Sequence, residues 1–411
     1  MRKFVELNKD QKILKVALDV PVNKLFDYIS NDSKIKIGQY VKVPFGNRSL
    51  IGICCEISNK TQIESNKLKT TINIDSEVIF DTLMLKLLNF VSDYYHHPIG
   101  QTIMSVVPSR IKKNSPSSRK KELLFKANKK LTKEIIENFP KRQLRLKNIA
   151  NAILEENLRQ RDLKKLASNS AECIKKLEQL GLISSEVYIP KTINAKSIKP
   201  TLNEDQKNVI DCINQCKTFK PWLIHGVTAS GKTEIYINLI TKLLLDKPSQ
   251  VLMLIPEINL TPQLEARFQD RFYDKKIVIL HSYLSNLDRL DNWREAKAGK
   301  ADIVIGTRLA VFTPMPNLKM IIIDEEHDAS FKQSEGLKYH ARDVAMIRAK
   351  NSNIPIVMGS ATPSLEIWYK AINAQQNFQY FKLNKRAVDD SRLPIIKTIQ
   401  VNEKTKLQIS K

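Results

Sequence analysis

Between residues 201 and 385, six short apolar runs alternate with stretches of helical periodicity. Near-continuous apolar strands separated by helices are typical of a parallel sheet that is covered by helices on both faces. We therefore predict a multidomain α/β chain in which this sheet is a major part. The runs are WLIH (222–225), VLMLI (251–255), IVIL (277–280), DIVIG (302–306), MIIID (320–324) and IPIVMG (354–359).

Polar or glycine-bearing residues follow each of these runs directly. In an open α/β sheet, ligands bind outside the carboxyl ends of the strands. Six polar clusters in that position predict a functional site along this edge. The clusters are GVTASGKT, PEINLTPQ, HS, GTR, DEEHD and GSATPS.

The first cluster matches the phosphate-binding pattern GxxxxGK[ST], and it lies between a predicted strand and a predicted helix, as the motif requires. Backbone N–H groups at the start of such a helix surround phosphates. Lys232 would reach the β- and γ-phosphates, and Thr233 would bind Mg²⁺. The predicted nucleotide-binding residues are Gly226, Val227, Thr228, Ala229, Ser230, Gly231, Lys232 and Thr233.

The segment MIIIDEEH supplies carboxylates for the same chemistry. Asp324, at the end of an apolar run, would hold Mg²⁺, and Glu325 would orient and activate the attacking water. Two carboxylates after a strand also occur in ordinary solvated turns. The phosphate loop earlier in the chain favours the catalytic interpretation.

Weaker signals agree with this site. Gln206, ahead of the phosphate loop, is where many helicase-like motors place an amide that reads adenine, although an isolated Gln on a helix is usually a surface residue. Thr307 and Arg308 of GTR, and residues 360–362 of GSATPS, would end adjacent strands of the same sheet. Hydroxyl groups and Arg are suited to bind the phosphates of DNA or nucleotide.

The charge of the chain points to a polyanionic partner. With 67 Lys+Arg against 43 Asp+Glu, the formal net charge is +24, which favours nucleic acid or an anionic membrane. The sequence contains no apolar run long enough to cross a membrane and no signal-peptide core. Five cysteines without a CxxC pair argue against disulfides and zinc, so we expect a cytoplasmic protein that does not bind a membrane.

The first half of the chain has a different organisation. Residues 13–57 predict a small β-rich module, and residues 81–95 a helix with Asp81 as its N-cap. A basic linker follows at residues 110–121. Residues 122–190 suggest a helix-turn-helix with a wing. The second helix would bury an apolar face of Cys173, Ile174, Leu177 and Leu180 and end at Gly181. An α-helical hairpin that does not touch DNA is the alternative. A second basic linker, 191–200, precedes the α/β region.

Taken together, these strings resemble superfamily 2 helicases, and among them the replication-restart family of primosomal protein N′ (PriA). The similarity lies in GVTASGKTEIY, LIPEINLTPQ, DEEHDASFKQSEGLKYHARDVA and GSATPSLE, with VALDVPVNKLFDYIS and GQYVKVPFGNRSLIGI near the N-terminus. Ala229 stands where the family usually has Gly. The resemblance implies a 3′-DNA-end-binding domain (1–110), a winged-helix domain (120–190), a RecA-like ATP-binding lobe (200–385) and the approach to a second lobe (386–411).

The resemblance also implies DNA-binding residues. Phe26 would stack on the terminal base, Asp27 would accept a hydrogen bond from the 3′-hydroxyl, Gly46 would allow close approach and Lys69 would bind a phosphate. Phe26 could alternatively be a core residue of the β-rich module. Residues 328–343 would couple DNA contact to ATP hydrolysis, with aromatic rings that stack on bases and basic side chains that bind phosphates. The candidates there are Phe331, Lys332, Tyr339, His340 and Arg342, with Arg308 as a further DNA contact.

The implied activity is that of an ATP- and Mg²⁺-dependent 3′ to 5′ DNA helicase acting on forked and single-stranded DNA with a 3′ end. Primosome proteins, helicase loaders and single-stranded-DNA-binding protein would be its partners. The residues after GSATPSLE are too few for a second lobe, and the family's zinc-binding cysteines are absent, so we expect the front portion of such a protein. One alternative is a module that binds forks and nucleotide without unwinding. Another is a different superfamily 2 translocase, which the N-terminal strings disfavour.

Overall fold

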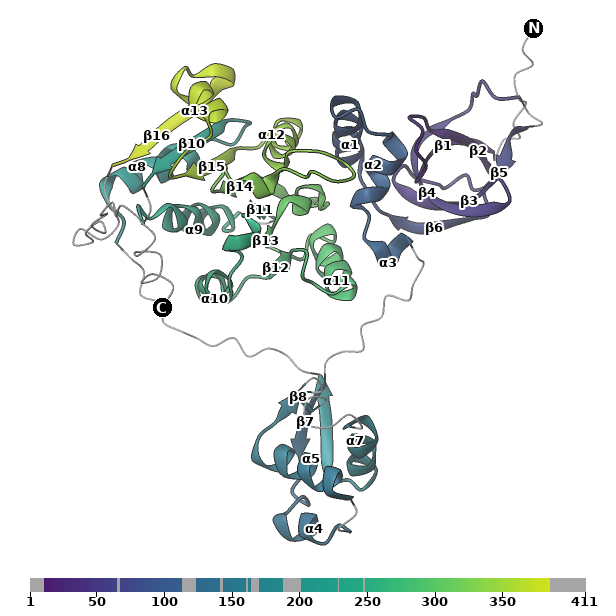
Figure 1. The fold of residues 1–411 in the computed structure, drawn as a ribbon, viewed down its shortest axis with the longest axis vertical. Helices are drawn as coiled ribbons and strands as arrows, with labels where there is room; N and C mark the ends of the chain where they lie inside the picture. The colour runs from purple at the N-terminus through teal and green to yellow at the C-terminus, as the bar shows by residue number, and fades with distance from the viewer. Residues whose placement is uncertain are drawn as a thin grey trace, which may run out of the picture. The chain divides into compact units, whose positions relative to one another are not determined.

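The computed structural model describes residues 11–64, 67–112, 123–140, 143–159, 162–163, 170–187, 201–227, 229–246 and 248–384 (Figure 1). The chain divides into two compact units, Met1–Pro108 with Lys196–Lys411, and Ser109–Ala195. We call residues 11–108 the N-terminal module, residues 201–384 the α/β lobe, and residues 109–187 the small unit. The expected second linker, 191–200, and the expected approach to a second lobe, 386–411, lie outside the described residues.

The N-terminal module is built on a six-stranded sheet with the order β5-β2-β1-β4-β3-β6. Most pairings are antiparallel, and β5 runs parallel to β2. Apolar side chains from β1, β2, β3 and β4 pack into one cluster. The elements are β1 (Lys12–Leu18), β2 (Phe26–Ser30), β3 (Gln39–Phe45), β4 (Arg48–Ser58), β5 (Lys69–Thr70), β6 (Asn73–Val78), α1 (Thr82–Tyr94) and α2 (Ile99–Val106).

Helix α1 begins where the sequence predicts. The Asp81 carboxylate accepts a hydrogen bond from the backbone N–H of Met84 at 2.7 Å, which satisfies one of the unpaired donors of the first turn. The helix is in contact with α12 of the α/β lobe. Ion pairs add to this association, because Glu77 on β6 binds Arg294 at 3.2 Å and Lys297 at 2.7 Å.

The small unit combines short helices with a three-stranded antiparallel sheet of order β8-β7-β9. Helix α7 precedes the predicted stop at Gly181, which has a φ of +66°. Leu180 is 50% exposed, so the prediction that it joins the apolar face of this helix was wrong. The winged-helix interpretation stays a prediction. The elements are α3 (Ser109–Lys112), β7 (Leu123–Ala127), α4 (Lys133–Glu137), α5 (Leu144–Glu155), β8 (Leu158–Arg159), α7 (Ser170–Gln179) and β9 (Ile183–Val187).

The α/β lobe holds a seven-stranded parallel sheet with the order β12-β13-β11-β14-β15-β10-β16. The six predicted strands are all present. The seventh, β16, was missed because FQYFKL has no continuous apolar run. The strands are β10 (Pro221–Gly226), β11 (Gln250–Leu254), β12 (Ile277–Leu280), β13 (Ile303–Gly306), β14 (Leu318–Asp324), β15 (Ile356–Ser360) and β16 (Gln379–Leu383).

Helices cover this sheet and bury its central strands, as the continuous apolar runs require. The strands that carry the phosphate loop (β10), GSATPS (β15) and DEEHD (β14) are neighbours, so their carboxyl ends converge. The helices are α8 (Glu204–Asn214), α9 (Lys232–Leu243), α10 (Pro262–Arg271), α11 (Asn286–Lys297), α12 (Ala341–Ser352) and α13 (Leu365–Ile372), with short 3₁₀ turns at Glu257–Asn259, Arg308–Phe312, Ala329–Phe331 and Gln375–Asn377.

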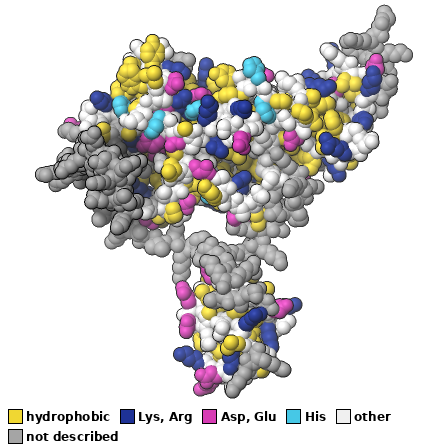
Figure 2. All heavy atoms as spheres, in the orientation of Figure 1, with side chains coloured by type: hydrophobic (Ala, Val, Ile, Leu, Met, Phe, Trp, Pro, Cys, Tyr) yellow, Lys and Arg dark blue, Asp and Glu magenta, His cyan; other side chains and the backbone are white. Residues whose placement is uncertain are grey.

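On the face shown in Figure 2, Lys and Arg side chains are scattered among acidic and apolar ones. The net charge of +24 is therefore not gathered into one patch on this face. Among the described helices, none combines the length and the apolar character needed to span a bilayer.

Candidate functional site

The phosphate loop connects β10 to α9, with Lys232 as the first helical residue. The Lys232 ammonium donates a hydrogen bond to the carbonyl oxygen of Gly226 at 2.9 Å and lies 3.6 Å from a carboxylate oxygen of Glu325. The lysine side chain is only 8% exposed. The Lys232 ammonium thus lies within the phosphate loop, next to a carboxylate that follows β14.

The loop also contains strain and an unsatisfied polar group. Ala229 has a φ of +63°, a left-handed conformation that costs a residue with a Cβ roughly 1–2 kcal/mol. Ala229 therefore replaces the family's usual Gly at a position whose backbone conformation favours Gly. The Ser230 hydroxyl is buried with no hydrogen-bond partner among the described residues. Thr228 lies outside the described residues, Val227 is exposed and Thr233 is half-buried.

Gln206 is buried rather than on the surface. Its side-chain oxygen accepts from the backbone N–H of Asn203 at 3.0 Å, and its NH₂ donates to the carbonyl oxygen of Ser230 at 3.0 Å. The first bond belongs to a capping box at the start of α8. Gln206 therefore connects the N-terminus of α8 to the phosphate loop. Its predicted contact with adenine stays a prediction.

Asp324 ends β14, as expected for a residue that binds Mg²⁺. Its carboxylate accepts a hydrogen bond from the hydroxyl of Tyr236, on α9, at 3.0 Å. Burial and the adjacent charge of Glu325 together raise the pKa of Asp324 to about 6. A cation bound beside this carboxylate would favour its ionised form. Tyr236 lies one turn after Lys232 on α9, and no pattern in the sequence pointed to it.

Glu325 and His327 continue the site toward β15. Glu325 has a φ of +46°, an unusual conformation for a residue with a side chain. The Nδ1 atom of His327 is 3.6 Å from the Glu325 carboxylate and 2.7 Å from the Ser360 hydroxyl. One imidazole thus links DEEHD to GSATPS. The sequence placed both segments at one sheet edge but did not indicate that His327 joins them. The prediction that GTR and GSATPS end adjacent strands was wrong, because β11 and β14 lie between β13 and β15.

Glu326 forms a second, buried link between the same segments. Its side chain is fully buried and accepts bonds from Arg342 at 3.1 Å and from the backbone N–H and hydroxyl of Ser364 at 2.6 and 3.0 Å. Arg342 also binds Asp343 at 3.0 Å and is itself buried. Its guanidinium is engaged inside the lobe. This geometry argues against the predicted direct contact of Arg342 with DNA.

The predicted coupling segment forms a hairpin whose aromatic rings face inward. Phe331 is fully buried, and Tyr339 packs edge-on against Phe312 with ring centroids 5.0 Å apart. The expectation that these two rings are available to stack on bases was therefore wrong, because they belong to the core. Lys332 is exposed and forms an isolated antiparallel bridge with His340. Arg308 donates to the carbonyl oxygen of Ser330 at 3.2 Å and is half-buried.

In the N-terminal module, Phe26 is half-buried at the edge of the apolar cluster. Its ring packs edge-on against Phe45 at 5.4 Å, and the Lys24 ammonium lies 5.0 Å from its centroid. Both earlier interpretations therefore have support, since one part of the ring packs on the core while another part is accessible.

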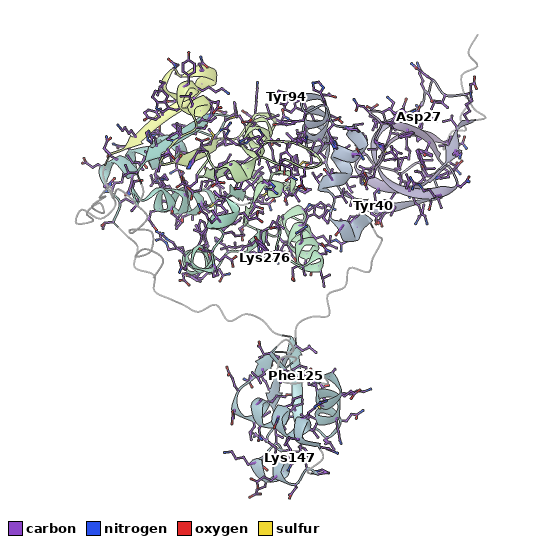
Figure 3. All side chains as sticks on the ribbon, in the orientation of Figure 1. Asp27, Tyr40, Tyr94, Phe125, Lys147 and Lys276 are labelled. Carbon is purple, nitrogen blue, oxygen red and sulfur yellow. The ribbon has the colours of Figure 1, made fainter. Side chains whose placement is uncertain are left out.

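Asp27 and Lys69 lie on neighbouring strands, because Tyr28 pairs with Lys69 across β2 and β5. The Asp27 carboxylate accepts a hydrogen bond from the Thr61 hydroxyl at 2.5 Å, and Lys69 is exposed. Asp27 is marked in Figure 3. Thr61 lies in the connection between β4 and β5, and nothing in the sequence indicated its contact with Asp27.

Gly46 lies in the tight turn between β3 and β4, next to Phe45. Its φ is +58°, and a Cβ at this position would meet no atom within 4 Å. The turn conformation thus accounts for the glycine without any close approach. The open space around it also leaves room for a ligand.

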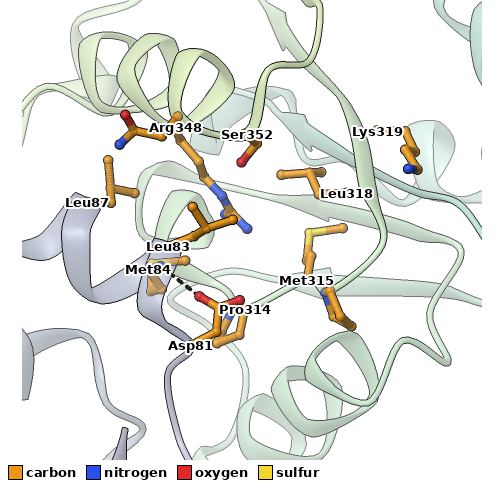
Figure 4. Close-up of a pocket in the computed structure, with 12 residues that line it drawn as sticks. Asp81, Leu83, Met84, Leu87, Pro314, Met315, Leu318, Lys319, Arg348 and Ser352 are labelled. Carbon is orange, nitrogen blue, oxygen red and sulfur yellow. Dashed lines mark hydrogen bonds between the residues drawn. The ribbon is translucent and has the colours of Figure 1, made fainter. Parts of the chain in front are cut away.

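The cavity in Figure 4 lies away from all of these residues, between α1 and the α/β lobe. Its volume is about 220 Å³, and its walls include Asp81, Leu83, Met315 and Arg348. Arg348 is buried and donates to the carbonyl oxygens of Val311 and Thr313 at 2.6 and 2.7 Å. Burial lowers the pKa of this guanidinium to about 10. None of the lining residues belongs to the phosphate loop or to DEEHD.

Comparison with known proteins agrees with both halves of this arrangement. Residues 15–108 match the family described as 3′DNA-binding domain (3′BD) of PriA, and residues 193–368 match the DEAD/DEAH box helicase family. The replication restart protein PriA of Haemophilus influenzae is 36% identical over 400 residues, which cover 93% of this chain and 53% of that protein. The chain belongs to the PriA family.

Other relatives carry the same name. The PriA of Bacillus subtilis is 38% identical over 252 residues, covering 59% of this chain and 31% of that protein. A solved structure of RecG bound to a three-way DNA junction matches with a TM-score of 0.36 and 20% identity over 52% of this chain and 27% of that chain, a likeness too weak to support an inference. This PriA-family chain spans about half the length of the curated relatives it matches.

The residues present fit ATP and Mg²⁺, which the helicase family uses. Among the described residues no group of three or more His, Cys, Asp or Glu side chains could hold a metal by itself. In a P-loop site, Mg²⁺ takes one hydroxyl and one carboxylate from the protein and obtains its other ligands from phosphates and water. Thr233 and Asp324 are the two groups predicted for that role. The unpartnered Ser230 hydroxyl is a polar group that a bound phosphate could satisfy.

Proposed function

We propose that the chain is the fork-binding and ATP-hydrolysing part of a replication-restart DNA helicase, which captures the 3′ end of a forked DNA, moves 3′ to 5′ along single strands and initiates primosome assembly. The convergence of Lys232, Asp324 and Glu325 at one sheet edge carries this proposal. The proposal assigns capture of the 3′ end to residues 1–110 and ATP hydrolysis to residues 200–385. The winged-helix-like residues 120–190 would add DNA contacts, and residues 386–411 would lead toward a second lobe.

In this proposal, the protein residues position the reactants. The Lys232 ammonium exchanges its bond to the Gly226 carbonyl for phosphate oxygens, and the Glu325 carboxylate orients and deprotonates the attacking water. Asp324 and Thr233 would hold Mg²⁺, which neutralises charge on the phosphates when bound. Through its contacts with Glu325 and Ser360, His327 would transmit changes at GSATPS to the water-activating carboxylate.

The Asp27 carboxylate supports recognition of a DNA end that carries a hydroxyl. A carboxylate accepts a hydrogen bond from a 3′-hydroxyl and repels a 3′-phosphate. Phe26 would stack on the terminal base, and Lys69, one strand away, would bind a nearby phosphate. Primosome proteins, helicase loaders and single-stranded-DNA-binding protein enter this proposal only through the family.

Fork-stimulated ATP hydrolysis and strand displacement test the proposal. We expect hydrolysis that rises with forked DNA, that Lys232→Ala abolishes together with nucleotide binding, and that Glu325→Gln abolishes with binding retained. Binding of forks and nucleotide without turnover would support the alternative of a binding module. A chain that binds neither nucleotide nor forks would refute both.

A further inference from the structure

We propose that Phe90 and Tyr94, on the exposed side of α1, form a platform on which bases of single-stranded DNA stack beside the hairpin 331–340. The inference rests on the proposed function and adds to it a DNA contact. The sequence suggested that the rings of the hairpin itself would stack on bases. The structure buries those rings and leaves a different aromatic pair, the exposed Tyr94 and the half-buried Phe90, next to the hairpin.

Phe90 and Tyr94 are one helical turn apart, so their side chains lie above one another on α1. Their rings are nearly parallel, with an interplanar angle of 17° and centroids 5.5 Å apart. Tyr94 is 64% exposed, and Figure 3 marks it at the end of α1. A flat aromatic surface that is already stacked on one partner can accept a base, because every base has a π-face.

The segment after Tyr94 is held firmly. The Ser92 hydroxyl donates to the carbonyl oxygen of His97 at 2.6 Å, and the His97 ring contacts the Thr102 hydroxyl at 3.1 Å. A Cβ at Gly100 would lie 1.8 Å from the carbonyl oxygen of Leu18, so α2 packs directly on β1. A platform fixed in advance loses little conformational entropy when it binds.

The aromatic pair is joined to the hairpin by direct contacts. Tyr95 packs edge-on against Tyr94 at 4.9 Å, and its hydroxyl accepts a hydrogen bond from the backbone N–H of His340 at 3.2 Å. His340 is in turn paired with Lys332 across the hairpin. A strand that stacks on Tyr94 would therefore lie close to a segment that adjoins DEEHD.

Charge complementarity favours a nucleic acid as the occupant. Lys86 lies one turn before Phe90 on the same side of α1 and is exposed, as is Lys332 on the hairpin. These cations can bind the phosphates of a strand that passes over the rings. Asp93 is the nearest acidic residue in sequence. Because it directly precedes Tyr94 on α1, its side chain leaves the helix in a different direction from those of Phe90 and Tyr94. The whole platform falls within residues 15–108, which match a DNA-binding family.

The experiment uses the full 411-residue chain and single-stranded DNA containing 2-aminopurine, whose fluorescence reports stacking. We expect Tyr94→Ala to weaken binding by about five- to a hundredfold, the range that corresponds to the loss of one base–aromatic stack. Tyr94→Phe keeps the ring and should bind as the unchanged chain does. Tyr369→Ala, which removes a 55% exposed tyrosine from α13, is the matched control and should have no effect.

The outcomes separate the inference from the function on which it rests. If the unchanged chain binds single-stranded DNA and Tyr94→Ala binds equally well with the same 2-aminopurine signal, the platform is refuted and the proposed function stands. That result would leave the pair as a protein-docking or structural feature. If the unchanged chain does not bind DNA, both fail. Equal thermal unfolding of Tyr94→Ala and Tyr94→Phe guards against a folding defect.

Discussion

The α/β lobe and the N-terminal module hold their candidate site residues in opposite ways. In the lobe, Lys232, Glu326 and Arg342 are buried and each is bonded to other site residues. In the module, Lys69 is exposed and Asp27 is half-buried, and the Asp27 carboxylate accepts a hydrogen bond from the Thr61 hydroxyl. Chemistry on ATP requires preorganised groups shielded from water, whereas capture of a DNA end requires accessible ones. The difference predicts that substitutions in the lobe change stability as well as function, and that those in the module change binding alone.

Glu326→Ala should show the largest effect on stability. It removes one of the two carboxylates that pair with the buried Arg342 and leaves the Ser364 N–H without its acceptor. Breaking a buried ion pair in this way costs about 3–5 kcal/mol. Urea unfolding measures the change. Glu335→Ala, an exposed glutamate on the hairpin, is the control and should change stability by less than about 0.5 kcal/mol. Similar small losses for both variants would contradict the view that the lobe site is interlocked.

Asp324→Asn should stabilise the chain in a pH-dependent way. Because the pKa of Asp324 is raised to about 6 from an unfolded value of 3.8, the folded state holds a proton that the unfolded state has lost, and stability falls as pH rises from about 4 to about 6. At pH 8 the variant should exceed the unchanged chain by up to about 3 kcal/mol. At pH 4 the two should be equal.

The same variant should lose Mg²⁺-dependent nucleotide binding, so that stability rises as function disappears. Thermal unfolding at pH 4 and pH 8, with and without Mg²⁺ and nucleotide, measures both effects. A stability difference that does not change with pH would show that Asp324 ionises normally in the fold.

Forks with a 3′-phosphate should bind about tenfold more weakly than forks with a 3′-hydroxyl, because one charged hydrogen bond is exchanged for repulsion. Asp27→Asn should remove most of this discrimination while changing the free energy of unfolding by less than about 1 kcal/mol. Fluorescence anisotropy with matched forks measures the ratio. If the ratio is one for the unchanged chain, Asp27 does not read the DNA end.

Lys69→Ala should have the smallest effect. It should leave stability unchanged and lower the slope of log affinity against log salt by about 1, the contribution of one phosphate contact. Lys67→Ala removes a nearby lysine that is paired with Glu64 at 2.8 Å, and it should alter the slope less. Equal slopes for the two variants would show that Lys69 contributes only general charge.

The same contrast explains how far the sequence could predict the site. In a parallel sheet the strand ends converge by topology, so the strings around Lys232 and Asp324 predicted their adjacency without knowledge of side-chain contacts. Neither Tyr236 nor His327 carries a local signal, because their roles come from how α9 and β15 pack. In the module, Asp27 and Lys69 come together through the pairing of β2 with β5, a long-range register that residue patterns do not encode. For Phe331 and Tyr339 the sequence pattern misled, because aromatic residues among basic ones predict DNA contacts and these two are buried core residues instead.

The Gln206 side chain makes one hydrogen bond to the start of α8 and another to the phosphate loop. It closes the capping box of α8 and at the same time holds the Ser230 carbonyl of the phosphate loop. Fraying of the first turn of α8 and opening of the loop are therefore thermodynamically linked, and whatever steadies one steadies the other. A partner that docked only on the start of α8 could adjust nucleotide affinity without touching the nucleotide. The amide thus makes a helix end into a control point for the loop.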